Sequence, residues 1–216
     1  MSSARDEMLA AIRGALADVS PSERGAAPGA LERGYRVSLD ASREKLVARF
    51  AERVEDYRAT VRRVDRDELS AAVAAACERR RARRIVVPAD APAEWRPDGV
   101  EVVEDAALSH EQLDRVDGVV TGCALGIAET GTIVLDAGAS QGRRAITLLP
   151  DYHLCVVDED QVVGGVPEAL ARLEESARAG RPITFVSGPS ATSDIELERV
   201  EGVHGPRTLE VLLVSG

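Results

Sequence analysis

The chain has 216 residues, of which 44% are hydrophobic and only 3% aromatic, and its formal net charge is −10 at pH 7. This length suits one domain with an appended N-terminal segment, whose core must be built from Val, Leu, Ile and Ala. An acidic chain with few aromatic residues lacks the clustered cations and stacking rings that nucleic-acid binding needs, so we expect no nucleic-acid partner.

Lysine and cysteine usage excludes several kinds of chemistry. Lys45 is the only lysine, which removes Walker-A chemistry and, unless Lys45 itself reacts, Schiff-base chemistry. Cys77, Cys123 and Cys155 are widely spaced and form no CxxC pair, so we expect buried thiols and no iron–sulfur cluster or structural zinc bound by this chain alone. Without a signal peptide or a long apolar run, a cytoplasmic protein with no membrane span is expected.

Apolar residues at three- and four-residue spacing predict helices over 2–18, 42–59 and 65–82. The first helix carries Met8, Ile12 and Leu16 on one stripe and precedes a segment containing Pro and Gly. We therefore expect an N-terminal helical arm over 1–40 and the main domain over 41–216.

The main domain alternates helices with short Val- and Ile-rich runs. A further helix is predicted over 166–180, with Pro167 near its start and Gly180 past its end. Strands are predicted over 83–90, 99–105, 116–128, 131–138, 152–159, 182–188 and 208–216. This order predicts an α/β fold with helices on both faces of the sheet. Strands follow one another without a helix over 116–136, so we expect a mixed sheet.

Three loops hold most of the unusual residues: 126–132, 136–144 and 187–206. In open α/β folds, ligands bind in the crevice beyond the carboxyl ends of the strands. We expect all three loops to meet there, at one rim of the sheet.

The first of these loops, "GIAETGTIVL", places Glu129 between two apolar runs, followed by Thr130 and Thr132. One interpretation is a polar hairpin tip. The other is a carboxylate that acts as a base, nucleophile or orienting group, with the threonine hydroxyls contacting substrate beside it.

The second loop, "DAGASQGRRAITLLP", contains Ser140, Arg143 and Arg144. A helix that begins near Ser140 would place free N–H groups and an arginine where they hold an anionic ligand. The alternative is an ordinary serine-capped helix with solvated arginines. Asp136 is either part of a strand-end turn or a functional carboxylate.

The third loop, "SGPSATSDIELERVEGVHGP", is rich in hydroxyls and turn residues. Ser193 begins a capping box, S-x-x-E, so part of the loop has a structural explanation. Ser190 and Asp194 are candidates for ligand binding. His204 is held between glycines and a proline and is a candidate for proton transfer, although a hydrogen-bonded structural role is the alternative.

The other histidines offer little chemistry by their sequence context. His153 opens a strand and His110 begins an acidic helical turn, and we expect structural roles for both. No two histidines have metal-ligand spacing, so no metal site is predicted.

In this order, the segments "GIAETGTIVL", "GRRAITLLPDYHLCVV" and "SGPSATSDIELERVEGVHGP" resemble the lactate utilization protein C family, also called LUD-domain proteins. The resemblance covers roughly residues 40–216. It implies a fold similar to the ribose-5-phosphate isomerase and CoA-transferase group. It also implies a role in oxidising L-lactate to pyruvate alongside partner proteins of the same pathway, one of which carries the iron–sulfur cluster. Relatives often have an arginine after "SGPS", where this chain has Ala191.

Three hypotheses follow. The chain is a subunit of an L-lactate-oxidising complex that binds a small anion, with Arg143 or Arg144 as its counter-ion. Alternatively, it is a free-standing enzyme on a CoA-transferase-like scaffold that acts on an acyl-CoA or phosphosugar through Glu129. The third hypothesis is a regulatory or assembly module that contacts its partner through the N-terminal helix.

Overall fold

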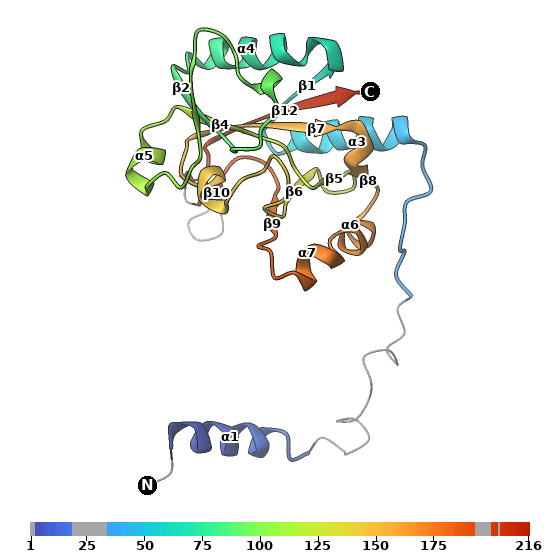
Figure 1. Ribbon diagram of the computed structural model, residues 1–216. Helices are drawn as coiled ribbons and strands as arrows, with labels where there is room; N and C mark the ends of the chain where they lie inside the picture. Colours follow the sequence, from blue (N-terminus) through green and yellow to red (C-terminus); the bar gives the residue numbers. More distant parts are fainter. Residues whose placement is uncertain (1–2, 19–33, 193–199, 203) are drawn as a thin grey trace. The chain divides into compact units, whose positions relative to one another are not determined.

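A computed structural model of the chain describes residues 3–18, 34–192, 200–202 and 204–216. Its contacts divide the chain into two units, Met1–Arg36 and Val37–Gly216. The first unit contains helix α1 (Ala4–Ala15), which begins at a capping box formed by Ser3 and Asp6 (Figure 1). The side chains of its predicted apolar stripe, Met8, Ile12 and Leu16, are exposed to solvent.

The second unit is built on a six-stranded sheet, which we call the large sheet. Its strand order is β1-β12-β7-β4-β2-β3, and every pair of neighbours is parallel. The strands are β1 (Thr60–Asp65), β2 (Arg84–Val87), β3 (Glu101–Glu104), β4 (Gly118–Thr121), β7 (Tyr152–Asp158) and β12 (Thr208–Ser215). Strands β7 and β12 are neighbouring interior strands and are buried along almost their whole length, as expected for a parallel sheet covered on both faces.

Four further strands form a separate sheet, which we call the small sheet, in the order β8-β5-β6-β9. They are β5 (Leu125–Ile127), β6 (Thr132–Leu135), β8 (Val162–Val163) and β9 (Thr184–Val186). Strand β6 is antiparallel to both β5 and β9, whereas β5 and β8 are parallel. The predicted α/β class is confirmed, but the expected single mixed sheet is two sheets. A short pair, β10 (Ala191–Thr192) and β11 (Val200–Glu201), stands apart.

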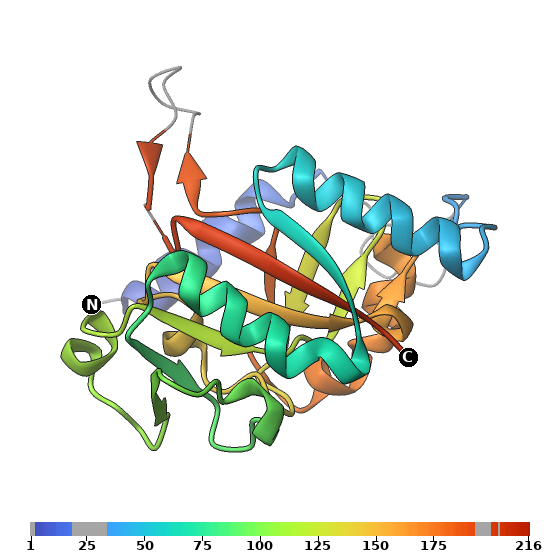
Figure 2. The same cartoon turned by 90° about the horizontal axis from the view of Figure 1, so that it is seen from above.

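Helices cover both faces of the large sheet, as predicted. The α-helices of this unit are α3 (Arg43–Asp56), α4 (Leu69–Arg80), α5 (His110–Asp114), α6 (Val166–Arg172) and α7 (Glu174–Arg178). Short 3-10 turns are η2 (Arg66–Glu68), η3 (Ala93–Trp95), η4 (Arg144–Thr147) and η5 (Glu159–Gln161). Helix α4 packs on one face of the large sheet, and α3 packs on the opposite face together with the small sheet (Figures 1 and 2). Helices α6 and α7 lie against the far side of the small sheet.

Strand β7 divides its side chains between these two cores. Tyr152, Leu154 and Val156 belong to the core under α4, whereas Cys155 and Val157 belong to the core shared with α3 and the small sheet. Because side chains alternate along a strand, His153 lies on the same side as Cys155, between the two sheets. No helix within the described ranges is long and apolar enough to cross a membrane.

Candidate functional site

A cavity of about 330 Å³ lies where β9 leads into the 187–206 segment. Its walls are Arg144, Thr147, Leu148, His153, residues 184–190, residues 204–206 and Leu209. The volume falls at the lower end of the range typical of small-molecule sites, about 300–1,000 Å³. Around Arg144 and His204 the cavity meets a wider groove of about 770 Å³ that both residues also line.

This cavity lies at the amino ends of the central strands, because His153 and Leu209 are at the starts of β7 and β12. The cavity is therefore at the opposite end of the large sheet from the one expected, although residues 187–190 do follow the carboxyl end of β9. The reason is topological: the 187–206 segment leads into the start of β12, which runs parallel to β7.

Two candidates from the third loop, Ser190 and His204, line the cavity together. The hydroxyl of Ser190 accepts a hydrogen bond of 2.9 Å from the backbone N–H of His204. The backbone of Ser190 donates to the carbonyl of Pro206 and accepts from Gly202. These bonds hold the histidine next to the serine, whose own hydroxyl proton has no acceptor among the described residues and can be donated to a ligand. Asp194 and the predicted capping box of Ser193 and Glu196 lie outside the described residues.

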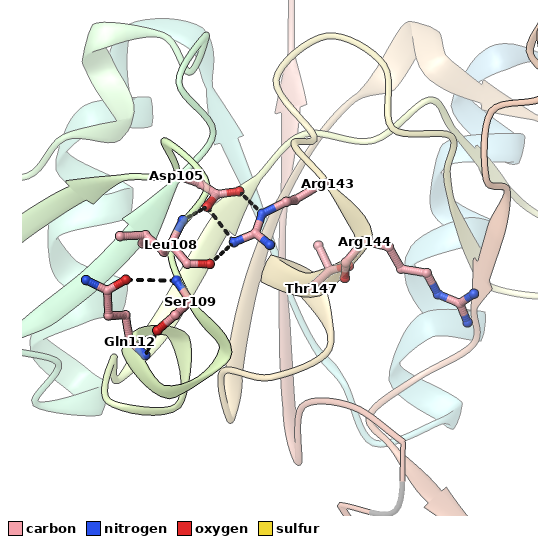
Figure 3. A network of polar contacts seen from close by, with 7 residues as sticks. All are labelled: Asp105, Leu108, Ser109, Gln112, Arg143, Arg144 and Thr147. Atoms are coloured by element: carbon pink, nitrogen blue, oxygen red, sulfur yellow. Dashed lines mark hydrogen bonds and ion pairs between the residues drawn. The ribbon is translucent and has the colours of Figure 1, made fainter.

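The two neighbouring arginines have different surroundings, and Figure 3 shows their side chains pointing in opposite directions. Arg143 binds the carboxylate of Asp105 with two hydrogen bonds of 2.7 and 2.9 Å and also donates to the carbonyl of Leu108. The bond to Asp105 raises the pKa of the Arg143 guanidinium. Arg143 is therefore held by Asp105, and it does not line the cavity.

Arg144, in contrast, lines the cavity and the adjoining groove, and its side chain is exposed. Among the residues that the structure describes, it has no ion-pair partner. A guanidinium with this freedom suits a carboxylate ligand, which it can bind with two parallel hydrogen bonds.

A chain of hydroxyls connects the first loop to the cavity wall. Thr130 Oγ1 lies 2.7 Å from Thr132 Oγ1, which lies 2.8 Å from Ser187 Oγ. Ser187 lines the cavity, whereas Thr130 and Thr132 do not. The two threonines therefore support the wall from behind.

Glu129 is not among the residues that line this cavity. It lines a separate depression of about 280 Å³ with Thr130 and the end of helix α3. Its backbone N–H donates to the carbonyl of Gly164, which ties the hairpin tip to the segment after β8. Of the three loops expected to meet, the second and third therefore contribute Arg144, Ser190 and His204 to the cavity, whereas Glu129 and Arg143 do not line it.

The expected helix at Ser140 is also absent from this part of the structure. Ser140 has a positive φ of 55°, which a continuing helix does not allow, and its N–H donates to Asp90 rather than facing a ligand. Asp136 is buried and accepts hydrogen bonds from Gln141 and Ser176 and an ion pair from Arg181. Asp136 is thus a structural carboxylate at the end of β6.

His153 lines the cavity although its sequence context predicted only a structural role. It is 1% exposed and lies 2.8 Å from Thr121 Oγ1 through Nε2. The buried thiols of Cys155 and Cys123 continue this polar cluster between the sheets. Hydrogen bonding with Cys123 lowers the pKa of the Cys155 thiol, against the effect of burial, and His153 acts in the same direction. The available signal was the alternation of "YHLCVV", which puts the histidine and the cysteine on one face of a fully buried strand.

Comparison with known protein families matches residues 47–214 to the LUD domain. The chain belongs to the LUD domain family. A protein of Deinococcus radiodurans named Lactate utilization protein C is 49% identical over 98% of this chain and 96% of its own length. Another protein of that name, from Bacillus licheniformis, is 34% identical over 56% of this chain and 53% of its own length.

A solved structure of this family agrees with the architecture described above. The crystal structure of a DUF162 family protein from Deinococcus radiodurans superimposes with a TM-score of 0.71 at 45% identity. The aligned region covers 82% of this LUD-family chain and 99% of the solved chain.

Proposed function

We propose that this LUD-domain protein acts in lactate utilization, as a subunit of a system that oxidises L-lactate to pyruvate together with iron–sulfur partner proteins. The observation that carries the proposal is the 49% identity to a Lactate utilization protein C over nearly the whole of both chains. The cavity supports it independently, because its exposed cation and hydroxyls suit a small carboxylate.

Within the proposed subunit, the cavity binds lactate or pyruvate. Arg144 binds the carboxylate, and Ser190 donates a hydrogen bond from the wall. Oxidation of lactate removes two electrons and two protons, so a base is needed close to the hydroxyl carbon. His204 lines the same cavity and is the residue we assign to accept one of these protons, and the other proton is released to solvent.

The electrons are assigned to a partner protein. Iron–sulfur clusters are held by several cysteine thiolates that converge on one site. Cys77 is buried in the core under α4, whereas Cys123 and Cys155 are buried between the sheets. This distribution supports a division of labour in which a partner carries the cluster and this subunit binds the organic acid.

Reconstitution tests the proposal. The partner proteins are expressed with and without this chain, and lactate-dependent reduction of an artificial electron acceptor is measured. We expect full activity only with the chain present, and a loss of about tenfold or more with Arg144→Ala, since charged hydrogen bonds contribute about 1.5–3 kcal/mol. Arg178→Ala is the matched control, because Arg178 pairs with Glu174 on the surface of α7.

Two outcomes would contradict the proposal. The partners alone oxidising lactate at the full rate would exclude a required subunit. Turnover of an acyl-CoA or phosphosugar by this chain alone, abolished by Glu129→Gln, would favour the free-standing enzyme.

A further inference from the structure

The floor of the cavity carries a buried imidazole that the proposed function does not yet use. His153 opens β7, the strand between β12 and β4, and is paired in register with Leu209 and Val119. It is the least exposed polar side chain of the cavity wall, whereas Arg144 and His204 are exposed. The cavity thus has a cationic rim and a histidine at its base.

The hydrogen bonds of Thr121 determine which nitrogen of this ring carries the proton. Thr121 Oγ1 lies 2.8 Å from His153 Nε2 and donates to the carbonyl of Gly122 at 2.9 Å. A hydroxyl has a single proton. With that proton directed to the carbonyl, the threonine accepts from Nε2–H, and Nδ1 of the neutral ring is an acceptor; a threonine that donated to Nε2 would instead require the ring proton on Nδ1.

An acceptor discriminates between the two acids of the proposed reaction. The hydroxyl group of an α-hydroxy acid can donate to Nδ1, whereas the keto oxygen of an α-keto acid has no proton to donate. The thiol of Cys155 has an acceptor of its own, the carbonyl of Gly122 at 3.7 Å, so it does not need Nδ1 as a hydrogen-bond partner.

We propose that His153 is a ligand-binding residue that accepts a hydrogen bond from the hydroxyl of a small α-hydroxy acid whose carboxylate lies at Arg144. This inference rests on the proposed function and deepens it. The cavity therefore binds an α-hydroxy acid more tightly than the corresponding α-keto acid, and Thr121 is a positioning residue that holds the ring in the required tautomer.

Nuclear magnetic resonance of the full chain with labelled histidine tests this directly. The ¹⁵N shifts should show His153 protonated at Nε2 in the free protein. Added L-lactate should shift the ring signals of His153 and His204 but leave those of His110, which is exposed on α5 and does not line the cavity. L-lactate should bind about fivefold or more tightly than pyruvate, the value of one hydrogen bond.

Two variants complete the test. His153→Phe should abolish the preference for L-lactate over pyruvate, and Thr121→Val should reduce it while keeping the ring. His110→Gln, the control, should leave it unchanged. If His153→Phe does not fold, the wild-type spectra and the relative affinities of Thr121→Val for L-lactate and pyruvate test the role of His153.

The outcomes separate this inference from the proposed function. The role of His153 is refuted, and the proposed site stands, if lactate shifts the ring signals of His204 but not those of His153. The same conclusion follows if folded His153→Phe and Thr121→Val keep the preference for L-lactate over pyruvate. If neither acid shifts any ring signal at concentrations up to tens of millimolar, the proposed binding of lactate is refuted, and the role of His153 with it.

Discussion

Arg143 and Arg144 are adjacent in sequence, and the structure predicts opposite consequences of removing each. Arg143 binds Asp105, whose side chain is only 4% exposed. Arg143→Ala leaves that carboxylate buried and unpaired, and breaking a buried pair costs about 3–5 kcal/mol. Because the Arg143 side chain is itself 38% exposed, we expect a loss of stability at the lower end of this range, about 3 kcal/mol. At about 2–4 °C per kcal/mol for a chain of this size, Tm should fall by about 6–12 °C.

Arg144→Ala should leave stability nearly unchanged, within about 0.5 kcal/mol, as for other exposed side chains without a structural partner. It should weaken binding of L-lactate about 10- to 100-fold, because a charged hydrogen bond contributes about 1.5–3 kcal/mol. Differential scanning calorimetry and isothermal titration calorimetry on the two variants measure both quantities. The reasoning is refuted if Arg144→Ala lowers Tm as much as Arg143→Ala, or if folded Arg143→Ala loses binding while Arg144→Ala retains it.

Three further variants test structural residues elsewhere in the second unit. Glu210→Ala should lower the free energy of unfolding by about 3–5 kcal/mol, because this buried carboxylate accepts hydrogen bonds from two arginines and from Tyr152. Chemical denaturation measures this loss, and a change below about 1 kcal/mol would contradict the prediction. Burial raises the pKa of Asp136, but hydrogen bonds from Ser176 and Gln141 and the charge of an arginine outweigh it and lower the pKa. The stability that this carboxylate contributes is therefore present above its unfolded pKa of about 3.9 and is lost as pH falls. Asp136→Asn should make the free energy of unfolding depend less on pH in the acid range, and the same pH dependence as wild type would contradict a stabilising role for Asp136. Gly131→Ala should destabilise the fold, since φ is +59° and a Cβ would approach the backbone of α3 within 2.5 Å; a thermal melt equal to wild type would show that the hairpin relaxes.

The helices and buried strands were predictable because their apolar periodicity is strong. Strand β1 was not predicted because Arg62 and Arg63 interrupt its apolar pattern. Their guanidinium groups form ion pairs with Glu210 on β12 and Glu159 on η5, respectively. Charged residues of this kind are common on edge strands. The division into two sheets was also beyond prediction, since strand partners far apart in sequence are chosen by tertiary packing.

The candidate site was predictable in part. The 187–206 loop and Arg144 were identified from residue type, and the structure places Arg144, residues 187–190 and residues 204–206 around one cavity. Sequence alone did not distinguish Arg143 from Arg144, because the difference depends on Asp105, far away in the chain. His153 was missed because its position between two sheets depends on the small sheet, which the sequence pattern did not separate from the large one.

The most direct test of the central claim is a crystal structure of the whole chain with L-lactate, at a saturating concentration determined beforehand by titration. We predict lactate in the cavity of about 330 Å³, with its carboxylate at Arg144 and its hydroxyl toward His153. Lactate bound beside Glu129 and Thr130, with water in the cavity, would contradict the account.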